Sequence, residues 1–286
     1  MSVSKQIRNL LPDKMYLKIM YKKRLGKKLN LKNPQTFNEK LQWLKLYDRN
    51  PEYSKMVDKY EAKEHAAKVI GEEYIIKTYG VWDKFDDIEF DKLPNQFVLK
   101  CTHDSGGIVI CTDKEKLDMT KAKEKIEKSL KNNYYYEGRE WPYKNVKPRI
   151  IAEEYMEDKT LGELRDYKFY CFDGKADYVM VCVDRKSGHP KFYYMDRTGS
   201  IKKEMSFDGM TLKEDIKIID NAKLNEMFNI AEKLSNGYKF LRIDLYNVDG
   251  KIYFGEYTFF PSAGFDNTRP EYASDYLDKM LKLGGK

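Results

Sequence analysis

The sequence is poor in the residues that build metal centres and disulfide frameworks. It has three histidines and four cysteines among 286 residues, and no two cysteines form a CxxC pair. The histidines are too few and too scattered for a histidine-built metal site, so carboxylates must hold any divalent metal. We expect the cysteines to be buried free thiols in a reducing cytoplasm, with a disulfide or zinc set as the alternative.

Long apolar runs are also missing. No window approaches about 18 uncharged apolar residues, which argues against a transmembrane helix. Residues 1–16 are broken by charges and by Pro12, unlike a secretory signal. Hydrophobic residues nevertheless make up 41% of the chain and aromatic residues 14%, which is typical of a chain that folds around a core. The length predicts about two domains.

Acidic residues are slightly outnumbered by basic ones, and the net charge is +7. The excess is concentrated in KKRLGKK, residues 22–28, directly after the apolar-rich segment 15–21. On a helix this pattern fits a solvated helix end, or a basic face (residues 22–32) that contacts an anionic membrane or an acidic polymer. Basic residues elsewhere alternate with acids, so we expect no nucleic-acid partner.

The first 70 residues are predicted to be helical. Apolar residues recur near helical spacing over 37–46, after Thr36, which can cap the helix. A second helix is predicted over 54–70. From about residue 73 the pattern changes to short strands, first at 74–82 and then as a glycine-turned hairpin over 96–112.

The middle of the chain contains a charged helix, predicted over 113–132, and then an aromatic segment, 132–149, which we expect to be mobile. Its part 134–143 is either a lid that binds an acceptor substrate or a surface loop. Mixed antiparallel strands with helices in separate blocks follow, which favours the α+β class over a doubly wound parallel sheet. The predicted elements are strands at 148–156, 166–185 and 191–202, a helix at 224–236, a hairpin at 240–260 and a helix at 274–284.

Two acidic residues lie on opposite arms of the hairpin that turns at Asp249–Gly250. Alternation places Arg242, Asp244 and Tyr246 on one face, and pairing about the turn brings Asp244 close to residues 253–255, so that it shares a site with Glu256. Carboxylates without cationic partners repel, which raises a pKa unless a divalent cation neutralises them. Magnesium suits such a pair. The alternative is a solvent-facing acidic strand edge.

Lys100 ends an apolar strand and precedes the Ser105–Gly107 turn. Glycine-rich turns let backbone N–H groups approach phosphate oxygens, so this stretch is a candidate phosphate cradle, although a plain hairpin is the alternative. His103 beside the turn either assists proton transfer or is structural. The strand IIAEEYM, residues 150–156, could present its backbone to a purine edge.

The order of these features resembles the ATP-grasp superfamily. The segments DKYEAK, FVLKCTHDSGG, REWPYKNVKPRIIAEEYM, DYKFYCFDGK and FLRIDLYNVDGKIYFGEYTFFPSAG resemble its TupA-like branch, often labelled as glycosyltransferases of teichuronopeptide or capsule synthesis. The resemblance covers about residues 30–275. It implies an α+β ATP-grasp fold, in which two subdomains clasp ATP: a helical segment 1–70 in place of the usual N-terminal domain, a small lobe 71–157 and a large lobe 158–286.

The resemblance also implies which residues bind ATP and magnesium. Lys100 matches the phosphate-binding lysine, and Arg242 matches a cation that stabilises the acylphosphate or the tetrahedral oxyanion. The remaining matches are the phosphate loop (Ser105, Gly106, Gly107), the adenine-facing Glu153 with its hinge (Tyr155, Met156), an acidic ribose ligand (Asp166), a phosphate lysine (Lys168) and the magnesium ligands (Asp244, Glu256, and Thr258 where an Asn is usual).

A carboxylate–amine ligase that acts through an acylphosphate is therefore the expected activity. We expect it to join an amine or amino acid to a uronic acid or another acidic sugar during capsular polysaccharide biosynthesis. Its place would be the cytoplasm, or the inner face of the membrane. A glycosyltransferase, an ATP-grasp phosphotransferase and a non-enzymatic basic adaptor are the alternatives.

Overall fold

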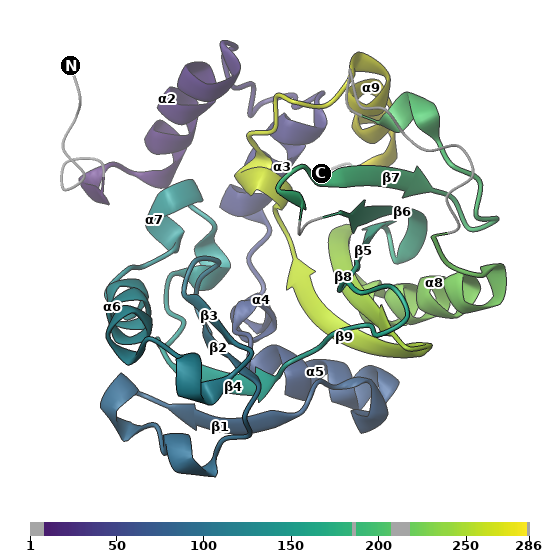
Figure 1. Ribbon diagram of the computed structural model, residues 1–286. Helices are drawn as coiled ribbons and strands as arrows, with labels where there is room; N and C mark the ends of the chain where they lie inside the picture. Colours follow the sequence, from purple (N-terminus) through teal and green to yellow (C-terminus); the bar gives the residue numbers. More distant parts are fainter. Residues whose placement is uncertain (1–8, 185–186, 207–217, 285–286) are drawn as a thin grey trace.

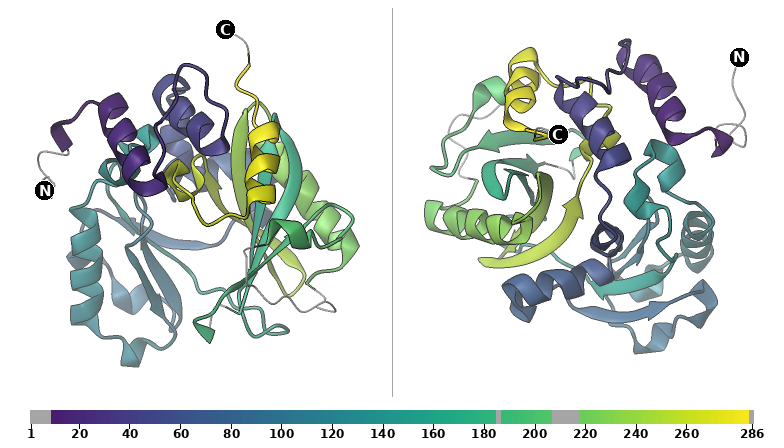
Figure 2. Two further views of the ribbon diagram at one scale, coloured as in Figure 1. Left: turned by 90° about the horizontal axis from the view of Figure 1, so that it is seen from above. Right: turned by 180° about the vertical axis from the view of Figure 1, so that it is seen from behind.

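The computed structural model describes residues 9–184, 187–206 and 218–284, which form two lobes built on separate antiparallel sheets (Figure 1). Viewed from above (Figure 2, left), the sheets stand on opposite sides of the molecule, and the N-terminal helices lie across one end. Short 3₁₀ helices connect the main elements, at Glu72–Tyr74, Phe85–Asp87, Phe90–Lys92, Lys114–Lys116, Trp141–Tyr143, Lys203–Met205 and Pro261–Gly264.

The smaller lobe contains a four-stranded sheet with the order β1-β4-β2-β3. Its strands are β1 (Thr78–Trp82), β4 (Ile150–Glu154), β2 (Phe97–Cys101) and β3 (Ile108–Cys111). Helix α6 (Met119–Leu130) packs on the sheet through Ala122 and Ile126, which share a core with Phe97 and Leu99. The predicted hairpin over 96–112 is confirmed, whereas the α-helix predicted over 113–132 begins only at Met119.

The larger lobe contains a five-stranded sheet with the order β7-β6-β5-β8-β9. Its strands are β7 (Lys191–Met195), β6 (Lys175–Val183), β5 (Asp166–Phe172), β8 (Phe240–Val248) and β9 (Lys251–Thr258). Helix α8 (Asn221–Ser235) covers one face, where the Phe169 and Phe228 rings meet edge to face at 5.0 Å. Every strand pair in both sheets is antiparallel, which confirms the predicted α+β class.

From Asp13 onward, the α-helices that precede the smaller sheet are α2 (Asp13–Leu25), α3 (Phe37–Tyr47), α4 (Glu52–Val57) and α5 (Glu61–Ile70). Thr36 caps α3 in a capping box with Glu39, as predicted. The single helix predicted over 54–70 is wrong. Asp58 is extended, and its Oδ1 accepts hydrogen bonds from the backbone N–H of Tyr60 and Glu61, so the chain stops and starts a new helix there.

The aromatic segment, which we expected to be mobile, is buried in its central part, over residues 138–140, while residues 144–145 and 147–148 are exposed. Part of it forms α7 (Tyr135–Gly138), and Arg139 is 1% exposed. The Arg139 guanidinium lies within 5.1 Å of the ring centres of Tyr16, Tyr135 and Tyr136. Cation–π contacts of this kind hold a segment against its neighbours. The pattern of the sequence did not show that α2 supplies one of these rings.

The C-terminal part of the chain follows its predicted elements closely. The β8–β9 hairpin turns at Asp249 and Gly250, both with positive φ, as an Asp-Gly hairpin turn requires. Helix α9 (Glu271–Met280) closes the described chain. All four cysteines are buried and free, as predicted. In the ranges described, no helix is both long and apolar enough to cross a bilayer.

Candidate functional site

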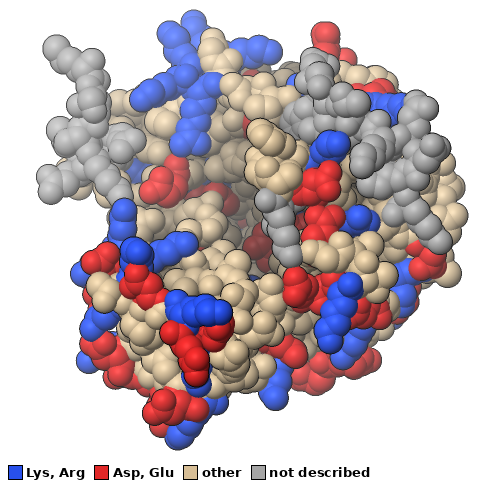
Figure 3. Space-filling view, in the orientation of Figure 1, with Lys and Arg blue, Asp and Glu red and all other residues tan. Residues whose placement is uncertain are grey.

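Two cavities lie between the lobes, where the space-filling view shows a central hollow (Figure 3). The first cavity, of about 350 Å³, has apolar and charged walls drawn from both sheets. Sequence-predicted residues that line it are Lys100, Glu153, Tyr155, Met156 and Asp166. The apolar side chains of Ile76, Val98 and Ile108 complete the part beside the small sheet. A flat, largely apolar ligand with a charged end suits such walls.

Glu153 forms the charged end of this cavity. The carboxylate is 3% exposed and pairs with two ammonium groups: Lys100 Nζ lies 2.5 Å from Oε2 and Lys63 Nζ 2.5 Å from Oε1. Burial raises the pKa of Glu153, but the two lysines outweigh it and lower the pKa to about 2. Glu153 is therefore ionised and engaged by lysines, instead of standing free to face a base.

Lys63 is a site residue that the sequence reasoning missed. It lies on α5, is 7% exposed, and its Nζ also donates to the carbonyl oxygen of Ile76 (2.7 Å) and to Thr78 Oγ1 (2.9 Å). Burial lowers the pKa of Lys63 and Glu153 opposes that shift. The available signal was a lysine on the apolar face of a predicted helix, between the buried Ala62 and Ala66.

The hairpin acids lie directly opposite each other, with Asp244 paired to Glu256 and Arg242 paired to Thr258. Asp244 lies close to Gly255, as expected, but its register partner is Glu256, one residue beyond the range 253–255. The register shifts between Asp244 and Leu245, and this β-bulge adds one residue to β9. The bulge aligns the two carboxylates on one face of the sheet.

Both carboxylates have cationic partners, so they do not depend on a divalent cation alone for neutralisation. Arg242 Nε lies 2.6 Å from Asp244 Oδ1, its Nη2 lies 2.7 Å from Oδ2, and Lys168 Nζ bonds the same Oδ2. Arg242 Nη2 also lies 3.2 Å from Glu256 Oε1. Burial raises the pKa of Asp244, but Arg242 and Lys168 reverse the shift and hold it below its usual value. At 2% exposure, Asp244 is not at a solvent-facing edge either.

The donor set on the hairpin fits a hard divalent cation. Asp244, Glu256 and Thr258 offer carboxylate and hydroxyl oxygens, and Thr258 Oγ1 lies 3.3 Å from Glu256 Oε1. Over the residues that the structure describes, no group of three or more His, Cys, Asp or Glu side chains forms a complete metal site. Magnesium needs no such group, because it commonly takes one or two carboxylates and completes its shell with water and phosphate oxygens.

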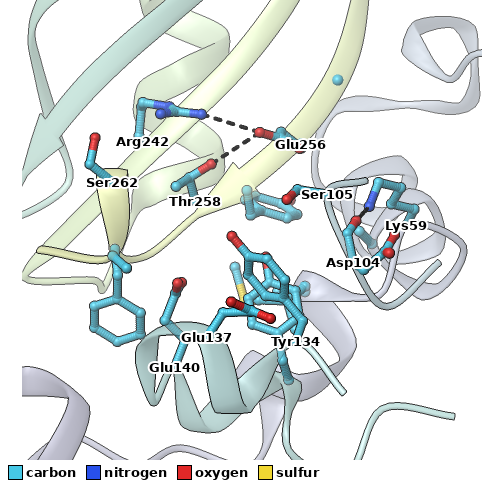
Figure 4. Close-up of a pocket in the computed structure, with 18 of the residues that line it drawn as sticks. Lys59, Asp104, Ser105, Tyr134, Glu137, Glu140, Arg242, Glu256, Thr258 and Ser262 are labelled. Atoms are coloured by element: carbon cyan, nitrogen blue, oxygen red, sulfur yellow. Dashed lines mark hydrogen bonds and ion pairs between the residues drawn. The ribbon is translucent and has the colours of Figure 1, made fainter. Parts of the chain in front are cut away.

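The second cavity, of about 360 Å³, lies on the other side of Glu256 and is shown in Figure 4. Arg242, Glu256 and Thr258 of the hairpin form one wall. The opposite wall is the aromatic segment, which contributes Tyr134, Glu137, Glu140 and Tyr143. The segment that we predicted to be either an acceptor-binding lid or a surface loop thus lines a cavity. Patterning did not single out Glu140, because its burial depends on packing against α3 and β8.

The glycine turn between β2 and β3 reaches this second cavity through Ser105. Gly107 is buried, and a Cβ there would lie 2.4 Å from Ser129 Oγ and 2.7 Å from Cys101 Sγ. Gly106 faces open space, with only Asp104 Oδ2 at 3.9 Å from its Cβ position. Gly107 therefore allows α6 to pack closely, while Ser105 and Gly106 form the exposed tip of the turn.

His103 is structural, so the proton-transfer hypothesis for it is wrong. It is 2% exposed, and its Nε2 lies 3.2 Å from the carbonyl oxygen of Ser129 and 3.0 Å from that of Asn132. Two carbonyl acceptors require a protonated Nε2, which ties the ring to the end of α6. Lys59 is a cation near the turn that patterning missed: its Nζ bonds the Asp104 carbonyl oxygen, and it lines the second cavity.

Two antiparallel sheets with lysines and a carboxylate pair between them are the arrangement expected of the ATP-grasp class. Residues 39–282 match the TupA-like ATP-grasp family model, so the chain belongs to that family. This confirms the predicted family, the ATP-grasp fold and the ATP-grasp class of enzyme. A comparison with curated proteins gave no match.

Several solved structures are similar to this chain. D-alanine–D-alanine ligase from Bacillus anthracis is 17% identical with a TM-score of 0.45, and the match covers 79% of this chain and 66% of that one. The Helicobacter pylori ligase is 13% identical, with a TM-score of 0.46 and coverage of 86% and 69%. The ATP-grasp ligase PsnB with its minimal precursor is 11% identical, with a TM-score of 0.42 and coverage of 85% and 66%. The matched region thus spans just under two thirds of the first of these structures.

Proposed function

We propose that this protein is an ATP- and Mg²⁺-dependent carboxylate–amine ligase that acts through an acylphosphate. Its substrates are a uronic acid or another acidic sugar of capsular polysaccharide biosynthesis and an amine or amino acid. The observation that carries the proposal is the convergence of four cations, Lys63, Lys100, Lys168 and Arg242, on two buried carboxylates between the sheets. Such a density of buried positive charge suits a polyphosphate and its reacting group.

The nucleotide would bind with its base in the first cavity, against Tyr155 and Met156, and with its phosphates toward Lys63 and Lys100. The triphosphate would replace Glu153 as the anionic partner of Lys63 and Lys100. Asp244, Glu256 and Thr258 are the residues that would hold magnesium, which when bound offsets charge on the transferred phosphoryl group.

The acceptor carboxylate would attack the γ-phosphate and give an acylphosphate and ADP. An amine would then displace phosphate to form an amide. The protein contributes positioning and charge stabilisation to both steps. Arg242 faces the second cavity from β8, so it can stabilise the oxyanion of the tetrahedral intermediate.

An anionic acceptor fits the charge of the second cavity. Arg24 and Lys59 line it together with Arg242, and the whole chain is basic. A uronic acid brings both the carboxylate that reacts and hydroxyl groups for hydrogen bonds.

The decisive assay combines the protein with ATP, magnesium, glucuronate or galacturonate, and a panel of amino acids. The ligase releases ADP and inorganic phosphate in equal amounts and forms an amide that mass spectrometry detects. A phosphotransferase would release ADP and keep the phosphate on the sugar. A glycosyltransferase would leave ATP intact and consume a nucleotide sugar. Either of these two results would overturn the proposal.

The surface of α2 supports a peripheral contact with an anionic membrane. Met15 and Ile19 are 53% and 47% exposed, and Lys18, Lys22 and Lys23 surround Ile19. Figure 3 shows basic side chains gathered at the upper edge, over α2. Exposed apolar residues flanked by lysines match the charge and depth of an anionic lipid surface.

Vesicle co-sedimentation tests this contact. The wild-type chain should bind vesicles that contain phosphatidylglycerol and ignore pure phosphatidylcholine, with binding that weakens as salt rises. Reversing the charges of Lys18, Lys22 and Lys23 to Glu should abolish binding. The matched control reverses Lys92, Lys116 and Lys121, exposed lysines of the smaller lobe, to Glu. Equal loss in both triple variants would contradict a specific role for α2.

A further inference from the structure

The wall of the second cavity opposite the hairpin holds a carboxyl group that the ATP chemistry leaves unused. Glu140 follows α7, is 5% exposed and lines the cavity with Glu137. Figure 4 shows both side chains rising from the α7 segment toward the hairpin residues. Within the described part of the chain, the Glu140 carboxyl makes no hydrogen bond or ion pair. Its oxygens therefore face the cavity, and a carboxylate held in such a buried wall attracts a cationic ligand.

Lys45 on α3 is the cation that acts most strongly on Glu140, but it cannot cover its oxygens. Lys45 Nζ donates to Gln42 Oε1 at 3.0 Å, to the carbonyl oxygen of Gly138 at 2.7 Å and to that of Ala263 at 2.7 Å. An ammonium group has three N–H donors, and these three acceptors use all of them. Lys45 therefore offsets part of the negative charge of Glu140 but donates no hydrogen bond to its carboxyl oxygens, which face the cavity.

The other charged and titratable groups around Glu140 come from every side of the cavity. Arg242 of β8 lowers the pKa of Glu140 and Glu256 of β9 raises it, while burial raises it most, to about 7. Tyr134 and Tyr143 lie close enough for Glu140 to raise their pKa values, and Glu137 acts on Tyr134 as well. Burial thus outweighs Lys45 and Arg242 in setting the pKa of Glu140 above its ordinary value.

We infer that the second cavity binds the amine substrate as an ammonium ion, which Glu140 anchors and from which it takes a proton. This inference rests on the proposed ligase reaction. A primary ammonium supplies N–H donors and the positive charge that a buried carboxylate lacks. A neutral hydroxyl would leave that charge uncompensated. Glu137 and Glu140 would repel an anion from this wall, so the acidic acceptor belongs at the cations Arg24, Lys59 and Arg242 elsewhere in the lining. The position also suits the chemistry, because Arg242, which would hold the acylphosphate carbonyl, lines the same cavity.

Amide formation requires that the ammonium ion lose two protons and that the acyl group lose phosphate. The ammonium gives one proton to the Glu140 carboxylate, and the free amine forms a C–N bond to the acyl carbon. The C–O bond to phosphate then breaks, and phosphate leaves with the electron pair. The second N–H proton leaves with that phosphate. A base matched to its surroundings in this way contributes about 10²–10⁴-fold to such a step.

Binding measurements test the anchor without any turnover. Calorimetric titration of the full chain at pH 8 with ethanolamine, alanine and serine should detect at least one amine, whereas ethylene glycol should not bind. Glu140→Gln should weaken the amine about tenfold or more. The control is Glu124→Gln, which changes an exposed carboxyl of α6 outside the cavity and should change the affinity for the amine less than about threefold. Equal affinity in wild type and Glu140→Gln, or no amine bound, would overturn the inference.

Two further measurements distinguish the loss of amine binding by Glu140 from a loss of folding. Wild-type affinity for the amine should fall about tenfold between pH 8 and pH 6, as Glu140 becomes protonated. With ATP, magnesium and glucuronate, hydroxylamine should trap the acylphosphate equally well in wild type and Glu140→Gln, because it is already a free base at neutral pH. Amide formation by Glu140→Gln should fall about 100-fold and recover as pH rises.

The inference and the proposed function fail in different ways. If wild type forms no hydroxamate with any uronate, the ligase proposal fails. The calorimetric titration with amines still tests whether Glu140 binds an ammonium ion. If hydroxamate forms and Glu140→Gln makes amide at the wild-type rate, the ligase stands and the assignment of Glu140 falls.

Discussion

Asp244 and Glu256 are direct cross-strand partners on β8 and β9 because a β-bulge adds Gly255 to the second strand. Without the bulge, the pairing that runs from the turn would place Asp244 opposite Gly255 and Glu256 opposite the buried Ile243. A one-residue slip moves a side chain to the other face of a sheet. The carboxylate pair therefore depends on a glycine that carries no functional group of its own.

Replacing that glycine should separate the two carboxylates. A Cβ on residue 255 would lie 2.9 Å from the Asp244 carbonyl oxygen, so Gly255→Ala must move one strand. We expect a loss of about 1–3 kcal/mol in the free energy of unfolding and at least a tenfold loss of ATP turnover. Urea denaturation and a steady-state ADP assay measure the two. Lys251→Ala, at an exposed position of the same strand, should change neither; full turnover by Gly255→Ala would show that the pairing is dispensable.

Alanine substitutions at Gly106 and Gly107 should differ in their effect on stability, because only Gly107 is closely packed. Gly107→Ala should destabilise the chain by about 1–3 kcal/mol, because its Cβ would overlap Ser129 Oγ and Cys101 Sγ. Gly106→Ala meets only one atom within 4 Å and should cost under about 0.5 kcal/mol. Thermal unfolding of both variants decides this, and equal shifts would contradict the distinction.

Lys100→Ala and Asp244→Asn should both abolish ATP turnover but differ in stability. Removing Lys100 leaves Glu153 paired with Lys63. Asp244→Asn instead removes the carboxylate shared by two cations, and leaves Arg242 with Glu256 at 3.2 Å and Lys168 with Asp166 at 3.8 Å as longer and weaker pairs. Breaking a buried pair in this way costs about 3–5 kcal/mol.

A second substitution checks that explanation. Adding Lys168→Met to Asp244→Asn removes one of the stranded charges, so part of the lost unfolding free energy should return while turnover stays absent. If the double variant is no more stable than Asp244→Asn, unpaired charge is not the cause.

Glu153 should make stability depend on acid pH. Its pKa falls from an ordinary 4.5 to about 2 in the folded chain, so its contribution is complete above about pH 4.5 and is lost as pH falls toward 2. The shift corresponds to about 3 kcal/mol. Urea unfolding between pH 2 and pH 7 should show a shallower pH slope for Glu153→Gln than for wild type. Identical slopes would mean that Lys63 and Lys100 do not hold the carboxylate ionised.

The local sequence pattern was sufficient to predict many of the helices, strands and turns. The Thr36 cap depends on neighbours within one turn, and the Asp249–Gly250 hairpin depends on two residues that tolerate positive φ. The helix break at Asp58 was missed because apolar spacing continues across it, while the competing hydrogen bonds come from the Asp58 side chain itself.

The sequence by itself determined the family, the antiparallel α+β class and some of the residues that face the space between the sheets, among them Lys100, Glu153 and Asp166, because strand alternation and turn chemistry act over a few residues. Only the tertiary structure decided which charges meet. The Lys63–Glu153 pair joins α5 to β4, and the buried Glu140 lines one cavity with Arg242 and Glu256 of the hairpin. Contacts of this kind depend on the packing of distant segments, and no periodicity in the chain encodes their distances.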